Sequence, residues 1–219
     1  MFDEYAAVVR QLNWSDTEQV SRDTRQLLAH LAEDRDALRA AVEECRRAPQ
    51  LWCMCEHYDI LDKLVLHHDV ESDARIRLHV FGDGRFDRPH NHRWPYAARV
   101  LSGSYEHYLY TIKPERKISM GTATPDDLQL EFVERRERGT SYFLKEHLYH
   151  SIGAEPCTIS LIIRGPASKA QFTVMDRTKG EAWTQYSNSQ ESRSEKVEKR
   201  MTEAQYREMV RKLKEKGVI

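Results

Sequence analysis

The feature that most constrains the fold is a series of short segments in which apolar and polar residues alternate. After about Asp59, β-branched and aromatic residues recur with a period of two, and the segments end near glycine, proline or aspartate. They cover residues 61–69, 74–82, 96–112, 128–136, 140–144, 157–165 and 170–176. Because several short strands at such spacing are typical of sandwiches and barrels, the sequence predicts a mainly β fold.

Helical periodicity replaces this alternation at both ends of the chain. In the first part, apolar residues recur at helical spacing, and Asp16 can cap the second of two or three helices. Near the end, Thr202 can cap and Gly217 can stop an amphipathic helix. We therefore expect a helical segment packed on one β domain, and then a polar linker with a last helix. The expected boundaries are 1–58, 59–187 and 188–219.

The balance of charges limits the kind of partner. With 34 basic and 35 acidic side chains, the formal net charge of −1 offers no bulk attraction to nucleic acid or to an anionic membrane. The N-terminus has acids where a signal peptide needs cations, and no apolar stretch reaches membrane-spanning length. The four cysteines do not have the pattern of a disulfide framework. We expect a cytoplasmic protein that acts on a small molecule, with no nucleic-acid or membrane partner.

His90 and His92 are the strongest candidates for a metal site. On a β-strand, residues i and i+2 project from the same face, so both imidazoles can reach one point. Two imidazoles alone hold a divalent metal weakly, and a third ligand has to come from a distant part of the chain. The candidates for that third ligand are His147 and His150.

The spacing of residues around this pair resembles the first motif of the cupin superfamily. That motif is a glycine, His-x-His, usually a glutamate, and then a glycine, and the matching positions here are Gly84, His90, His92, Tyr96 and Gly103.

The second cupin motif follows in order, within further β-patterned sequence. Counting from Gly139 places its terminal histidine on His150, although Lys145 and His147 stand where the family usually has proline and glycine. The resemblance covers about residues 63–186. It implies a single cupin barrel, a double-stranded β-helix of jelly-roll type, with helices at both ends.

The resemblance also implies that His90, His92 and His150 hold a metal ion. Tyr96 replaces the usual glutamate ligand, and a neutral phenol with a pKa near ~10 is a poor ligand for a divalent ion. A three-histidine site is similar to that of cysteine dioxygenase and other non-heme iron dioxygenases, so Fe(II) is expected. Mn, Co, Ni, Cu and Zn also fit an all-imidazole site. A metal-free cupin whose histidines bind a sugar or fill the barrel mouth is the alternative.

The resemblance to cysteine dioxygenase extends to the helical preface and to one late strand. In that family this strand carries a serine, a histidine and a tyrosine, at positions that correspond here to Ser160, Ile162 and Arg164. Only the serine is shared. Arg164 is either a clamp for a substrate carboxylate in the barrel mouth or a strand-end arginine in solvent.

Two further groups of residues, each on one face of its predicted strand, lie before and after the first cupin motif. Tyr105, His107 and Leu109 follow the Gly103 turn, and if this face lines the barrel His107 lies near the metal, where it can act as an acid or base. The set of Arg75, Arg77 and His79 is opposite an apolar face. We expect the apolar face to point inward and these three polar residues to lie on the surface. Trp94 and Tyr96 either form the floor of an apolar substrate pocket or pack in the core of the barrel, and we expect the core.

Taken together, the residues favour a mononuclear Fe(II) dioxygenase that uses O₂ and a small polar, amino-acid-like substrate. In this hypothesis Tyr96 hydrogen-bonds oxygen or substrate, and Arg164 holds the substrate's acid group. One alternative is a lyase or isomerase that uses the ion as a Lewis acid, with Tyr96 or His147 as base. A non-catalytic ligand-binding cupin is another. Cupins often pair through sheet edges, so a homodimer is compatible with the resemblance.

Overall fold

The computed structural model of the chain describes residues 2–82, 86–113, 123–186 and 197–219. Residues in strands outnumber those in helices, and helices lie at both ends of the chain, which confirms the predicted mainly β class. Gly84 of the first motif and most of the predicted linker, residues 188–196, lie outside the described residues.

The helices begin and end where the capping residues predict. Asp16 accepts hydrogen bonds from the backbone N–H groups of Glu18 and Gln19, and Thr202 forms a capping box with Gln205. Gly217, with a φ of 64°, follows the last helix. The helices are α1 (Phe2–Gln11), α2 (Thr17–Glu33), α3 (Arg35–Arg47), the short α4 (Pro49–Trp52) and α6 (Glu203–Glu215).

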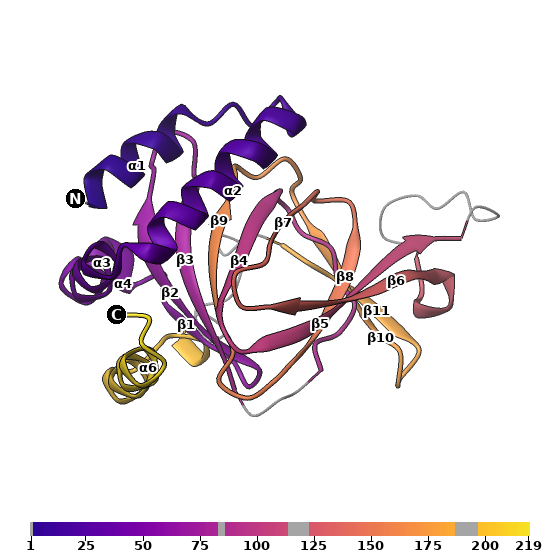
Figure 1. Cartoon of the computed structure of the whole chain (residues 1–219). Helices are drawn as coiled ribbons and strands as arrows, with labels where there is room; N and C mark the ends of the chain where they lie inside the picture. Colours follow the sequence, from indigo (N-terminus) through magenta and orange to yellow (C-terminus); the bar gives the residue numbers. More distant parts are fainter. Residues whose placement is uncertain (1, 83–85, 114–122, 187–196) are drawn as a thin grey trace.

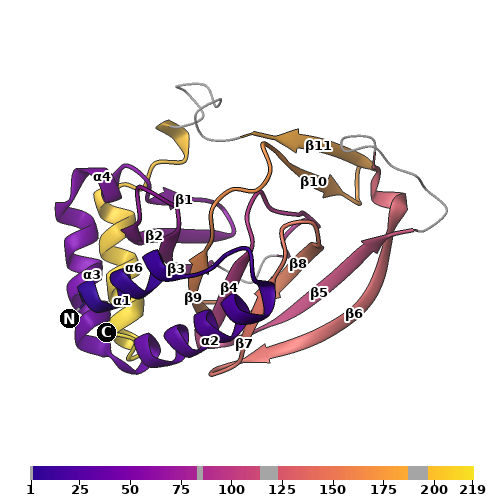
Figure 2. The same cartoon turned by 90° about the horizontal axis from the view of Figure 1, so that it is seen from above.

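The strands form antiparallel sheets (Figures 1 and 2). The six-stranded sheet has the order β1 (Glu56–His57), β2 (Leu61–His68), β3 (Arg75–Phe81), β9 (Ile159–Arg164), β4 (Tyr96–Ser102) and β7 (Ser141–Leu144). The three-stranded sheet has the order β6 (Leu128–Glu137), β5 (Ser104–Ile112) and β8 (Tyr149–Ala154), and the 3₁₀ turn η1 (Pro125–Asp127) precedes β6. A separate hairpin pairs β10 (Phe172–Asp176) with β11 (Glu181–Gln185).

The helices cover one face of the six-stranded sheet (Figures 1 and 2), and both termini lie on this helical side. The apolar residues of β3, including Ile76 and Leu78, pack in one buried cluster with Leu28 of α2, Leu38 of α3 and Met209 of α6. The predicted N-terminal segment, the β domain and the last helix therefore share a core. No helix in the described ranges has the length and apolar character needed to cross a membrane.

This packing reverses the predicted orientation of β3. The apolar face was expected to point inward, with Arg75, Arg77 and His79 on the surface, and that expectation is wrong. Arg77 is only 8% exposed, and Arg77 and His79 both line a cavity on the face away from the helices. The helices supply an apolar cover for the outer face of the sheet, so the polar residues of β3 point to the interior. Arg75 is partly buried and pairs with Asp73.

A second apolar cluster fills the space between the two sheets. Its members come from the inner faces of both, among them Phe81, Tyr96, Tyr105, Tyr142 and Ile162. The interior is therefore apolar around Tyr105 and polar along part of β3, and the candidate site lies where these two regions meet.

Substituting Gly103 tests the tight turn between β4 and β5. Gly103 has a φ of 75°, and a Cβ there would lie 2.5 Å from Thr158 Oγ1, which is itself hydrogen-bonded to Ser104. Gly103→Ala is expected to lower the free energy of unfolding by about 3 kcal/mol, through left-handed strain of about 1–2 and overpacking of about 1–3 kcal/mol. Denaturant unfolding measures this loss.

Gly180→Ala is the matched control. Gly180 has a φ of 69°, but nothing lies within 4 Å of an added Cβ. Only the strain of about 1–2 kcal/mol is expected there. Equal losses in the two variants would contradict the proposed contact with Thr158.

Candidate metal centre

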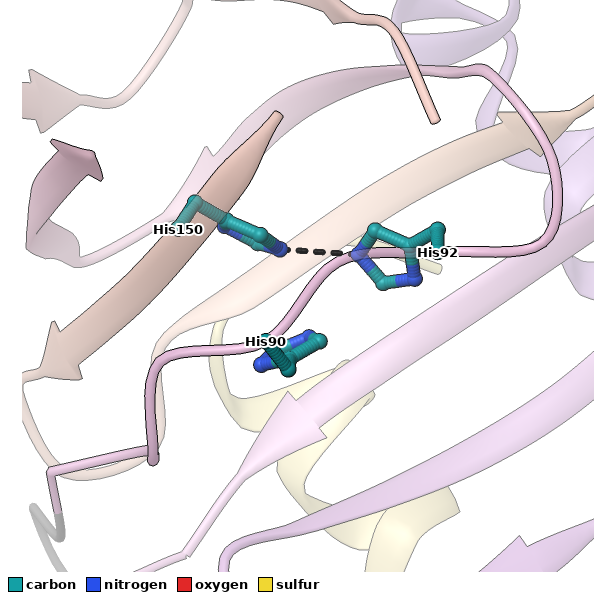
Figure 3. A group of neighbouring side chains, drawn as sticks. All are labelled: His90, His92 and His150. Carbon is teal, nitrogen blue, oxygen red and sulfur yellow. Dashed lines mark hydrogen bonds between the residues drawn. The ribbon is translucent and has the colours of Figure 1, made fainter. Parts of the chain in front are cut away.

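Three histidines from two distant segments converge on one point. His90 and His92 lie in the extended segment before β4, and His150 lies in β8. Their candidate ligand atoms all lie within 4.8 Å of one another. Figure 3 shows the His150 and His92 rings meeting nitrogen to nitrogen, with the His90 ring beside them. In the part of the chain that the structure describes, no carboxylate or thiol is among these candidate ligands, although the Asp87 carboxylate lies 3.3 Å from His90 Nδ1.

Backbone pairing holds His90 against His150. The His90 N–H donates to the His150 carbonyl at 2.9 Å, and the His150 N–H donates to the His90 carbonyl at 2.8 Å. On its other side His90 forms a β-bridge with Val174 of β10. In place of the strand expected at His90 and His92, the structure has two isolated bridges at His90, but both rings still lie together, with centroids 4.7 Å apart.

Hydrogen bonds orient the rings. His90 Nδ1 lies 2.8 Å from the Arg88 carbonyl oxygen, and His150 Nδ1 lies 3.0 Å from His107 Nε2. The Nε2 atoms of His92 and His150 are 2.8 Å apart. Because the Nδ1 atoms of His90 and His150 are engaged, Nε2 is the atom that each ring has left for a cation.

Burial keeps two of these rings neutral. Desolvation lowers the pKa of His92 and of His150 well below the ordinary value of 6.5, and charge on neighbouring histidines lowers it further. A neutral imidazole has a free lone pair, which is the form that binds metals. These two side chains are therefore ready to bind a metal ion at neutral pH.

Tyr96 presents a phenol at the edge of the cluster. Its hydroxyl lies 3.5 Å from His150 Nε2 and 3.5 Å from the Tyr142 hydroxyl, and the Tyr105 hydroxyl donates to that of Tyr142 at 3.0 Å. Burial raises the pKa of Tyr96 well above its usual 10, and Tyr142 raises it further. The position thus offers a hydrogen-bonding hydroxyl where the cupin motif usually has a carboxylate.

His107 lies behind His150. It is fully buried, its Nε2 contacts His150 Nδ1 at 3.0 Å, and it is not among the residues that line the cavity. Desolvation, followed by the charge of Arg136, lowers its pKa to about 3. The predicted closeness to the candidate metal ligands is observed. The geometry favours a residue that positions His150 over an acid or base in contact with substrate.

A cavity of about 310 Å³ opens beside the three histidines. This volume is at the small end of ligand pockets, which span about 300–1,000 Å³. Trp94 both packs against the second apolar cluster and lines the cavity, and Ser160 and Ile162 of β9 also line it. The cavity can hold a small molecule in contact with both the histidines and the polar face of β3.

Arg164 lies inside the protein, and the solvent-exposed alternative is wrong. It is 3% exposed and lines the cavity. Its Nη2 donates to Asp73 Oδ2 at 2.9 Å, its Nη1 donates to the Gly165 carbonyl at 3.1 Å, and the guanidinium lies 4.6 Å from the Trp94 ring centroid. Desolvation, followed by the charge of Arg77, lowers the pKa of Arg164 to about 9. Both Nη atoms thus already have protein acceptors.

His147, the alternative third ligand, is exposed in the turn between β7 and β8 and lies outside the histidine group. Sequence reasoning also missed Tyr142 and the strand β8 that carries His150. The parity of β7 could have found Tyr142, because Tyr142 pairs with Ala98, two residues beyond Tyr96 on the same face of β4.

The donor set fits the metal that the sequence resemblance implies. Three imidazole nitrogens suit Fe, Co, Ni, Cu and Zn, whereas Mg²⁺ and Ca²⁺ prefer oxygen ligands. His90, His92 and His150 would hold such an ion on one side and leave the side facing the cavity for other ligands.

Comparisons with known proteins concern the fold. No protein-family model and no curated protein matches the chain. An RmlC-like cupin from Shewanella frigidimarina NCIMB 400 is similar, with 17% identity over 52% of this chain and 85% of that chain, and a TM-score of 0.37. The DMSP lyase DddQ from Ruegeria pomeroyi DSS-3 is similar with 14% identity over 56% of this chain and 55% of that chain, at a TM-score of 0.39. The chain also resembles Streptomyces albus HEPD, solved with 2-hydroxyethylphosphonate and Fe(II) bound, with 17% identity over 51% of this chain and 22% of that chain, at a TM-score of 0.38.

Replacing single histidines tests the ligand set. His92→Ala and His150→Ala are expected to lose the metal that co-purifies with the untagged protein, because two imidazoles hold a divalent ion weakly. His147→Ala is the matched control and is expected to keep it, since His147 is exposed and outside the group. Mass spectrometry of metal content measures the effect. Stoichiometric metal in His150→Ala would show that the ligand set is wrong.

A second substitution tests the positioning role of His107. His107→Phe removes the nitrogen that contacts His150 Nδ1 and is expected to weaken metal binding by about 10–100-fold, measured by competition with a chelator. His107→Gln, which keeps a polar group, should restore part of the affinity. Tyr105→Phe is the control on the same strand face, because the Tyr105 hydroxyl contacts Tyr142 and no metal-ligand candidate. Unchanged affinity in a folded His107→Phe variant would rule the role out.

Proposed function

We propose that this protein is a mononuclear non-heme Fe(II)-dependent dioxygenase of the cupin type, acting on a small polar substrate of the amino-acid-like class. The observation that supports the proposal is the convergence of three imidazoles at the wall of a small cavity, with no carboxylate among the candidate ligands in the described residues. An all-imidazole set leaves a divalent ion with its full charge and with open positions for two reactants.

The metal would supply the part of the chemistry that side chains cannot. An Fe(II) ion brings O₂ and an organic substrate together, two reactants that combine slowly on their own because O₂ is a triplet.

The chain's own residues bind and orient the reactants. The Tyr96 hydroxyl lies close to His150 Nε2 and can donate a hydrogen bond to a reactant beside the histidines. Arg164 lies in the same cavity wall, and its contacts with Asp73 and Trp94 fix the shape of that wall. Trp94 and Ile162 give the cavity an apolar surface that limits the access of water.

Oxygen uptake tests this proposal directly. Iron-loaded protein is expected to consume O₂ in step with an amino acid or a small thiol from a substrate panel. His150→Ala should abolish the uptake, and His147→Ala should keep it. Turnover of a substrate in sealed anaerobic vials would contradict the proposal in favour of a lyase or isomerase that uses the ion as a Lewis acid. Ligand binding without turnover under either atmosphere would favour a binding protein.

A further inference from the structure

The cavity wall opposite the histidines carries an excess of positive charge. The cations that line the cavity are Lys63, Arg77, Arg88 and Arg164, against the single carboxylate of Asp87 among its described lining residues. Three of these cations already have carboxylate partners. The pairs are Lys63 with Glu56 at 3.6 Å, Arg88 with Asp176 at 3.0 Å and Arg164 with Asp73 at 2.9 Å.

Arg77 is the exception among these cations. It is 8% exposed, and no carboxylate of the described residues forms a close ion pair with it, although the charges of Glu56 and Asp73 act on it from farther away. Its Nε is buried without a partner. A buried charge without a close counter-ion is costly, so a ligand that brings the opposite charge to this position would bind favourably. Burial and the charge of Arg75 lower the pKa of Arg77 to about 10, so the group is still a cation at neutral pH.

Two polar residues that line the cavity, His79 and Ser160, lie close to Arg77. His79 lies two residues from Arg77 on the same strand face, and its Nε2 is buried with no hydrogen-bond partner in the described residues. Ser160 of β9 pairs with His79 in the sheet register, is 1% exposed and lines the cavity. A guanidinium, an imidazole and a hydroxyl thus stand side by side on neighbouring strands.

We propose that Arg77, with His79 and Ser160, binds the carboxylate of a small monocarboxylic acid, and that such acids are the substrate class of this protein. That these acids are substrates rests on the proposed function, whereas the binding of an anion at Arg77 does not. The assignment moves the acid-binding role from Arg164, whose Nη atoms are occupied, to Arg77.

The charge balance favours a carboxylate over a phosphate or phosphonate. Asp73 is shared by Arg75 and Arg164, so the lining cations together with Arg75 are five, against the four carboxylates of Glu56, Asp73, Asp87 and Asp176 in the described residues. One negative charge therefore completes the balance, and a dianion would add an uncompensated second. The planar guanidinium also matches a planar carboxylate through two parallel hydrogen bonds. The cavity of about 310 Å³ limits the molecule to a small one.

Trp94 links this subsite to the histidines. The Arg77 guanidinium carbon lies 5.8 Å from the Trp94 ring centroid, and the Trp94 ring lies 5.7 Å from that of His92. One aromatic side chain therefore borders both groups. An acid held at Arg77 would extend along Trp94 and present its other end to the histidines.

Binding measurements with simple probes test the proposal. The whole protein, metal-free and also iron-loaded under nitrogen, is titrated calorimetrically with lactate, lactamide and methylphosphonate. Lactate is expected to bind at least ~10-fold more tightly than the uncharged amide or the phosphonate, as a charge-assisted bidentate contact predicts. Arg77→Gln should weaken lactate binding by ~10–100-fold.

Arg88→Gln is the matched control, because Arg88 also lines the cavity but is paired with Asp176. It should change lactate affinity by less than ~3-fold, as expected for a partly exposed cation with its own partner. Arg77→Lys keeps the charge without the planar fork and should bind at an intermediate level.

Several results would overturn the proposal. They are equal binding of acid and amide by the wild-type protein, unchanged lactate affinity in a folded Arg77→Gln variant, or equal losses in the Arg77 and Arg88 variants. The comparison of the three probes on the wild-type protein decides the matter even if Arg77→Gln does not fold. The metal-free titration separates the two proposals. Lactate binding that depends on Arg77, in a protein that takes up no oxygen, would contradict only the proposed dioxygenase. Oxygen uptake by a protein whose lactate binding does not depend on Arg77 would contradict only the proposed subsite.

Discussion

The rest of the structure depends on how the apolar surface of the six-stranded sheet is covered. A strand presents alternate residues to its two faces, so a sheet with one apolar face needs a partner on that side. In this protein α2, α3 and α6 provide that partner, and Leu28 and Leu38 pack against the apolar residues of β3. The opposite face is thereby free to carry arginine, histidine and serine into the interior. The helices at the chain ends make a polar cavity compatible with a stable sheet.

The candidate centre depends on a few backbone contacts more than on side-chain packing. His90 and His150 are far apart in the sequence, and paired backbone hydrogen bonds bring their Cα atoms opposite each other. The rings are then oriented from behind, His150 by His107 and His90 by the carbonyl oxygen of Arg88. Burial removes the competing proton from His92 and His150. The positions of the rings and the neutral state of His92 and His150 are thus set before any ligand arrives.

Much of this arrangement could be predicted from local sequence signals. Period-two segments located most strands, the side chains of Asp16 and Thr202 located the starts of two helices, and motif spacing selected His90, His92 and His150. The orientation of β3 could not be predicted, because strand parity divides residues into two faces without telling which face meets the helices. The strand β8 was missed, since Gly153 and two polar residues interrupt its apolar pattern. Arg164 is paired with Asp73, a residue far away in the chain, and Arg77 is not, so only the fold reveals which arginine is paired.

The β-bridge between His90 and Val174 connects the histidine cluster to the hairpin of β10 and β11. The hairpin is also held to this segment by the hydrogen bond from the Thr173 N–H to Asn91 Oδ1 at 2.9 Å. A cation that binds the folded arrangement stabilises every contact that the arrangement requires, so its occupancy and the local opening of the hairpin are thermodynamically linked. Amide hydrogen exchange in β10 would then be slower when the cation is bound, and it would report cation binding at a distance from the histidines.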